Sequence, residues 1–80
     1  TQTKAFNKLV ELVSQHAGGE PAFIAIQHSE ADEAAETLYD LLVDALAPGS
    51  SVMVMEMSEV LRVHVGAGAI GVSAVFTVGD

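Results

Sequence analysis

The chain has 80 residues, a formal net charge of −8 and no cysteine, and 50% of its residues are hydrophobic. This length allows one small domain, and the missing cysteines exclude a disulfide framework and a thiolate metal site. The acidic balance argues against nucleic acid and anionic membrane surfaces as partners, because both select patches of lysine and arginine. The composition fits a protein of the reducing cytoplasm.

The chain is more apolar than a small soluble domain usually needs, with a mean hydropathy of +0.41. A domain of this size buries only about 60% of its unfolded surface. We therefore expect part of its apolar surface to pack against something outside these residues, as in a fragment of a larger unit or an obligate oligomer. Stable membrane insertion is not expected, because the longest apolar run, Val65 to Val78, is about 14 residues and a spanning helix needs roughly 18 to 20.

An amphipathic helix is predicted over Thr3 to Ala17. Apolar residues at positions i, i+3, i+4 and i+7 share one stripe of a helix, and the charged residues lie elsewhere. The stripe consists of Phe6, Leu9, Val10 and Val13. The pair Gly18-Gly19 favours the end of the helix, because glycine readily adopts the left-handed conformation found there.

A strand and a second helix follow. The short apolar run from Ala22 to Ile26 predicts a strand in the interior of a sheet. A helix is predicted from about Glu30 to Leu46, with leucines and alanines on its buried face. Ser29 and Asp32 have a spacing close to that of a capping box. The sequence Ala47-Pro48-Gly49 favours the end of this helix.

Two further strands complete the predicted fold. Residues Ser51 to Met57 alternate, and their three methionines are interpreted mainly as core packing, with the lining of an acyl-chain pocket as the alternative. Strand, helix and strand within about 35 residues predict a βαβ unit with parallel strands and a right-handed crossover. Ser58 to Val65 fits either a short helix or an extended loop. Ile70 to Val78 predicts a buried third strand that includes Val75.

The predicted fold class is therefore α/β, a two-layer domain with a βαβ unit and a third carboxy-terminal strand. The chain shows no internal repeat, low-complexity segment or linker. It is expected to form one domain or part of one.

The stretch from Val63 to Gly71 contains the main candidate site. His64 is interpreted as a hydrogen-bond donor to an anionic or carboxyl-bearing ligand. Gly66 and Gly68 are interpreted as positions that a ligand or another backbone can approach closely. A half-buried histidine bonded to a local carbonyl, followed by a purely structural turn, is the alternative interpretation.

Two other residues are weaker candidates. Arg62 is interpreted either as an anion-binding residue or as the partner of Glu59, one helical turn away. His28 ends the first predicted strand, where ligands often bind in βαβ units, although a polar residue beside a helix cap is the simpler interpretation. The spacing of the three histidines matches no metal motif, and the chain shows no catalytic triad or dinucleotide fingerprint.

Beyond these patterns, the chain resembles the carboxy-terminal portion of DegV-family proteins, the bacterial fatty-acid-binding proteins. The stretch Val63 to Gly71 is similar to the family's terminal pattern His-x-Gly-Pro-Gly-x-x-Gly, which precedes a final apolar strand. The segments Ala5 to Val13, Ile24 to Ala31 and Glu56 to Leu61 resemble the family in the same order. Ala67 departs from the family pattern, which has proline there.

The resemblance implies a function and a larger molecule. DegV-family proteins are two-domain α/β proteins that bind a long-chain fatty acid and present its carboxylate to a separate fatty acid kinase subunit, which makes an acyl-phosphate. By this resemblance, residues 1–80 are a fragment, the carboxy-terminal part of a DegV-like lipid-binding domain. The site would also need the upstream remainder of the protein, with His64 near the carboxylate. The resemblance implies a cytoplasmic carrier that has no cofactor and is not an enzyme.

Two other functions stay open from the residues alone. The first is a small α/β interaction or oligomerisation module that has no ligand and whose glycine loop is structural. The second is an enzyme subunit that binds a phosphorylated small molecule through Gly66 and Gly68. The lack of any lysine near that loop counts against the second function.

Overall fold

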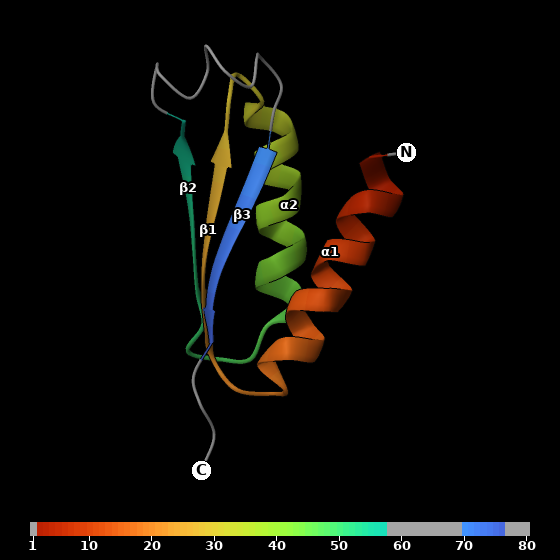
Figure 1. Cartoon of the computed structure of the whole chain (residues 1–80), viewed down its shortest axis with the longest axis vertical. Helices are drawn as coiled ribbons and strands as arrows, with labels where there is room; N and C mark the ends of the chain where they lie inside the picture. Colours follow the sequence, from red (N-terminus) through yellow and green to blue (C-terminus); the bar gives the residue numbers. More distant parts are fainter. Residues whose placement is uncertain (1, 58–69, 77–80) are drawn as a thin grey trace.

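The computed structural model describes residues 2–57 and 70–76. Its elements in chain order are the helix α1 (Gln2–Ala17), the strand β1 (Ala22–His28), the helix α2 (Asp32–Ala45) and the strands β2 (Ser51–Glu56) and β3 (Ile70–Phe76). Figure 1 shows the two helices side by side along the sheet. The prediction of a two-layer α/β domain is confirmed.

Helix α1 follows its apolar stripe. Phe6 and Val13 are buried, and Leu9 and Val10 pack against the core. The helix ends where predicted, because Gly18 and Gly19 have φ angles of 59° and 83°, which glycine adopts without steric cost.

Strand β1 is the central strand of the sheet, whose order is β2-β1-β3. It pairs in parallel with β2, so the predicted βαβ unit is confirmed. It pairs antiparallel with β3 on its other side. His28, the last residue of β1, lies opposite Glu56 on one neighbour and Ile70 on the other.

Helix α2 begins two residues later than predicted, at Asp32. The predicted capping box is wrong, because Ala31 occupies the N-cap position and no side-chain hydrogen bond caps it there. The backbone N–H of Ala31 instead donates to Nδ1 of His28, at 3.1 Å. The turn before the helix includes Glu30 with a φ of 53°, which lies outside the range of a right-handed helix, so the helix begins only after this residue.

The core lies between the helices and one face of the sheet. Ile24 and Ile26 of β1 contribute their side chains to it, together with Leu38 and Leu42 of α2. The partner residues of β2 and β3 on this face, such as Val52 and Val72, are half-buried against the same cluster. Hydrophobic burial between these layers is the main stabilising term of the fold.

The opposite face of the sheet is not covered by either helix, and we call it the open face. Side chains alternate along a strand, so the register assigns nine residues to it. These are Phe23, Ala25, Gln27, Ser51, Met53, Met55, Gly71, Ser73 and Val75.

Two sequence predictions are wrong on this face. The prediction that β1 lies in the interior of the sheet is confirmed, although Phe23 of β1 is 51% exposed on the open face. Val75 was expected in the core and is 65% exposed. Met53 and Met55 do not pack into the core, because they lie on the side of β2 that faces away from the helices. Apolar residues on both faces of a strand predict burial, and the sequence does not indicate which face the helices cover.

Candidate functional site

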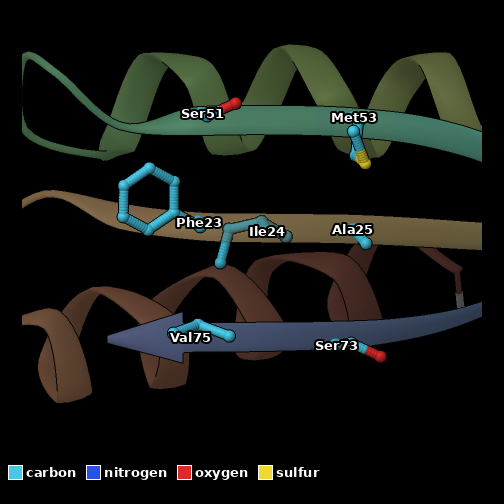
Figure 2. A pocket seen from close by; sticks show the side chains of 7 residues that line it. All are labelled: Phe23, Ile24, Ala25, Ser51, Met53, Ser73 and Val75. Atoms are coloured by element: carbon cyan, nitrogen blue, oxygen red, sulfur yellow. The ribbon is translucent and has the colours of Figure 1, made fainter. Parts of the chain in front are cut away.

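The open face contains an apolar hollow with a volume of about 250 Å³. Figure 2 shows that all three strands contribute to it and that the helices lie behind the sheet. The residues lining it are Phe23, Ile24, Ala25, Ser51, Met53, Ser73 and Val75.

The hollow arises from the sizes of side chains in two adjacent rows of the sheet. In one row Phe23 lies between Ser51 and Val75. In the next row Ala25 lies between Met53 and Ser73. The small side chains of Ala25 and the two serines leave space beside the phenyl ring and the thioether. The strand register, which places these small residues next to the large ones, therefore produces the hollow.

The chemistry of this hollow is apolar. Its lining has two hydroxyl groups, those of Ser51 and Ser73, and no charged side chain. Such a surface binds hydrocarbon by excluding water and offers no nucleophile with an adjacent base. The rim is exposed to solvent, so the hollow covers one side of a bound molecule, whereas small-molecule pockets bury about 70–90% of the ligand surface.

A polar corner lies at the carboxyl end of β1. His28 is 3% exposed, and its Nδ1 accepts the hydrogen bond from the backbone of Ala31. Its Nε2 lies 3.3 Å from Oδ1 of Asp32. An acceptor at Nδ1 assigns the ring proton of the neutral imidazole to Nε2, which then donates to the carboxylate. His28 thus accepts a hydrogen bond from Ala31, the N-cap residue of α2, which agrees with its interpretation as a polar residue beside a helix cap.

Ser29, next to His28, is fully buried. Its hydroxyl has no hydrogen-bond partner within the part of the chain that the structure describes. The carbonyl of His28 accepts a hydrogen bond of 2.7 Å from the backbone of Met57, which fixes the end of β2 at the same corner. The Ser29 hydroxyl is therefore the least satisfied polar group that the structure describes at this corner.

The predicted site residues Arg62, His64, Gly66 and Gly68 lie outside the described residues. The described chain leaves the sheet after Glu56 and re-enters it at Ile70, and both of these residues pair with His28. The structure thus brings the two ends of the segment that contains the candidates to the edge of the polar corner.

Sequence analysis gave a pocket lining only as the alternative role of the methionines, of which Met53 lines the hollow, and it missed the other lining residues. The sequence contains one signal for the hollow: Phe23 and Ala25, which alternate with the core residues of β1, are apolar, where a strand with one solvent-exposed face would have polar residues. A strand that is apolar on both faces needs a cover on both faces.

Within residues 2–57 and 70–76, no group of three or more histidine, cysteine, aspartate or glutamate side chains could hold a metal ion. In the same residues, no helix has the length and hydropathy needed to span a membrane.

Comparison with known proteins identifies a family. The model of the family described as "Uncharacterised protein, DegV family" matches residues 1–77. A DegV domain-containing protein of Corynebacterium glutamicum is 57% identical over 76 residues, which are 95% of this chain and 28% of that protein. A DegV domain-containing protein of Streptomyces coelicolor is 36% identical over 72 residues, which are 90% of this chain and 26% of that protein.

A solved structure agrees with these matches. The crystal structure of a DegV family protein from Corynebacterium glutamicum superimposes with a TM-score of 0.93 at 54% sequence identity. The match covers 100% of this chain and 30% of that chain. The chain therefore spans less than a third of the length of these relatives.

Proposed function

The chain belongs to the DegV family, and from that premise we propose that it forms part of a carrier that binds a long-chain fatty acid and presents the carboxylate to a kinase subunit. The kinase subunit makes the acyl-phosphate, and the carrier contributes no catalytic group of its own. We use "parent protein" for a DegV-family polypeptide that contains this chain.

The observation that supports this proposal is the apolar hollow on the open face. Phe23, Met53 and Val75 present aromatic, thioether and branched aliphatic groups to it. Burial of each methylene group contributes about 0.8 kcal/mol, so a long alkyl chain gains affinity from such a surface without any charged contact.

The proposal assigns the carboxylate to the segment that connects β2 and β3. His64 donates a hydrogen bond to it, Gly66 and Gly68 allow its close approach, and Arg62 supplies a positive charge nearby. These roles come from the family motif. They are supported by the chain connectivity, because the segment between β2 and β3 starts and ends beside His28.

Two further parts of the proposal follow from the family. The kinase subunit and the remaining part of the parent protein are its partners, and the cytoplasm is its location, where acyl groups are activated. No nucleic acid or metal cofactor takes part. The net charge of −8 suits a partner with a basic face, although charge alone does not select one.

The test is mass spectrometry of an organic extract of the purified parent protein. The proposal expects one long-chain fatty acid per polypeptide, and the same spectrum gives its chain length and saturation. A lipid-free extract, together with no rise in melting temperature on addition of fatty acids, would overturn it.

One observation favours a second function. The exposed apolar side chains of the open face also suit an interaction or oligomerisation module without a ligand. In that case the melting temperature would rise with protein concentration, whereas for a monomeric carrier it rises with fatty acid concentration.

A further inference from the structure

The exposed side of α2 has apolar and acidic side chains in adjacent rows. Tyr39 and Val43 are one helical turn apart and are 37% and 51% exposed. Glu36, Asp40 and Asp44 form a second row of exposed residues at the same i, i+4 spacing. Each apolar side chain follows an acidic one by three residues, so the two rows are neighbours on the helix. We call these five residues the α2 surface.

The charges of the α2 surface do not stabilise the helix. Like charges four residues apart repel each other, which disfavours the helix at the pairs Glu36–Asp40 and Asp40–Asp44. Asp44 also lies in the last turn, where the helix dipole favours a cation, and that turn has no basic residue. Within residues 2–57 and 70–76, no lysine or arginine pairs with these three carboxylates. A cation in this row would make the helix more stable, so the row suits a role other than helix stability.

We propose that the α2 surface is a docking surface for the kinase subunit, which presents lysine or arginine side chains around an apolar spot. An exposed tyrosine and valine beside charged residues have the arrangement of a protein interface, in which an apolar centre has a polar rim. The carboxylates then gain the cationic partners that the helix lacks. This inference rests on the proposed function and names the surface through which its protein partner binds.

Charge complementarity selects this occupant. A second copy of the chain would bring the same carboxylates together across a symmetric contact, and like charges that face each other across an interface cost affinity. Nucleic acid and anionic membranes are repelled for the same reason. A basic protein surface is the complement of the α2 surface, and the kinase subunit is the protein partner that the proposed function requires.

The position of the α2 surface suits a kinase that acts on the carboxylate. Figure 1 shows the amino end of α2 at the end of the sheet where β1 and β2 finish and β3 begins. In the proposed function the carboxylate belongs to the segment that connects β2 and β3. The α2 surface begins at Glu36, about 6 Å along the helix axis from Asp32, the first residue of α2. A kinase docked there lies beside the end of the sheet to which the carboxylate is assigned.

Charge reversal at one position tests the proposal in the parent protein. Asp40→Lys places opposite charges at i, i+4 with Glu36 and Asp44, so it should raise the melting temperature slightly. Glu20→Lys is the matched control, because Glu20 is also exposed and the change in net charge is the same, but it lies in the turn between α1 and β1. The rate of association with the purified kinase subunit is measured by stopped-flow fluorescence at several salt concentrations. The KM for the fatty-acid-loaded parent protein in acyl-phosphate formation is measured in parallel.

The expected result is that, at low salt, Asp40→Lys associates with the kinase subunit at least about tenfold more slowly than the wild type and Glu20→Lys do. The difference should shrink as salt is added, and the KM should rise while kcat does not fall. Equal association rates of the two variants would overturn the proposal. A dimer that dissociates in Asp40→Lys, with unchanged kinase binding, would also overturn it and identify a second copy as the occupant.

The same measurements separate this proposal from the proposed function. Slower association of Asp40→Lys in a parent protein that yields no acyl-phosphate would support docking on α2 and remove the proposed function. Acyl-phosphate formation by Asp40→Lys with the wild-type KM would support the proposed function and remove the docking surface.

Discussion

His28 and Asp32 face each other across the start of α2, with Nε2 of the buried imidazole 3.3 Å from Oδ1 of a carboxylate that is 84% exposed. The other ring nitrogen, Nδ1, accepts the backbone hydrogen bond of Ala31. One side chain at the end of β1 therefore fixes both the cap of α2 and the first acidic residue of that helix.

Replacing His28 should cost far more stability than replacing Asp32. His28→Ala removes a buried ring and leaves the Ala31 N–H without its acceptor, a loss of about 2 kcal/mol or more in the free energy of unfolding. Asp32→Ala removes a solvent-screened contact and should cost about 1 kcal/mol or less. Urea unfolding of the parent protein measures both. Equal losses would mean that the contact with Asp32, and not the hydrogen bond from Ala31, accounts for the contribution of His28 to stability.

The two serines beside β1 should respond in opposite ways to replacement by alanine. The Ser50 hydroxyl accepts a hydrogen bond from the backbone of Ala22 at 3.0 Å, so Ser50→Ala should lower the free energy of unfolding by about 1 kcal/mol. The Ser29 hydroxyl is buried without a partner among the described residues, so Ser29→Ala should be neutral or stabilising.

Each serine variant is the control for the other, since both remove one oxygen atom. Hydrogen exchange of the β1 amides in the parent protein measures the local effect. A loss at Ser29 as large as that at Ser50 would show that the parent supplies a partner for the Ser29 hydroxyl.

Replacement by alanine should change the free energy of unfolding differently at two glycines, because their backbone conformations differ. Gly49 has a φ of 92° in the turn where Ser50 N–H donates to the carbonyl of Ala47, an arrangement typical of a type II turn. Gly49→Ala should cost about 1 kcal/mol through strain, although the new methyl group would meet only ordinary contacts with Pro21. The shift of the urea midpoint measures this cost.

Gly71 is the comparison, because it does not have a positive φ and an added methyl group would lie 3.8 Å from Oε1 of Gln27. Gly71→Ala should therefore leave stability unchanged or raise it slightly, since glycine weakens a strand interior. A large loss at Gly71 in the parent protein would show that another backbone or a ligand lies against this row of the open face.

Filling the hollow should weaken fatty acid binding. Ala25→Leu places a larger side chain between Met53 and Ser73 and displaces about two methylene groups of ligand contact, or ~1.6 kcal/mol, which is about a tenfold weaker Kd. Ala45→Leu, at an exposed position of α2, is the matched control and should not change the affinity. Titration of the delipidated parent protein with a fatty acid measures both, and equal affinities would place the alkyl chain elsewhere.

The sequence predicts the periodic parts of this fold well. The stripe of Phe6 and Val13 and the breaks at Gly18-Gly19 and Pro48-Gly49 determine the helices and the βαβ unit, because these signals are local. The start of α2 was misplaced because the N-cap residue is Ala31, whose backbone N–H bonds to His28 of the preceding strand, and the side chain of Ser29 forms no cap.

The open face could not be predicted from the sequence for a different reason. Val75 and Met53 have the composition of core residues, and hydrophobicity indicates that a residue is covered but not by what. The antiparallel pairing of β3 with β1 also cannot be predicted from local sequence patterns, because the paired residues are more than forty positions apart in the chain. The hollow exists only once that pairing aligns Ala25 with Ser73.

The role proposed for His64 is tested by separating transfer from folding. If its imidazole donates to the fatty acid carboxylate, His64→Ala in the parent protein should reduce acyl-phosphate formation with the kinase subunit about tenfold or more, since hydrogen bonds to charged groups are worth about 1.5–3 kcal/mol. His64→Gln, which keeps a donor, should recover part of the activity. His16→Ala is the control, because His16 is exposed on α1 and bonds only to the carbonyl of Leu12 and stacks on Phe76 in the described chain. With the His16→Ala variant, acyl-phosphate should form at the wild-type rate. Unchanged acyl-phosphate formation in His64→Ala, at an unchanged melting temperature, would remove His64 from the site and leave it without a role in ligand binding.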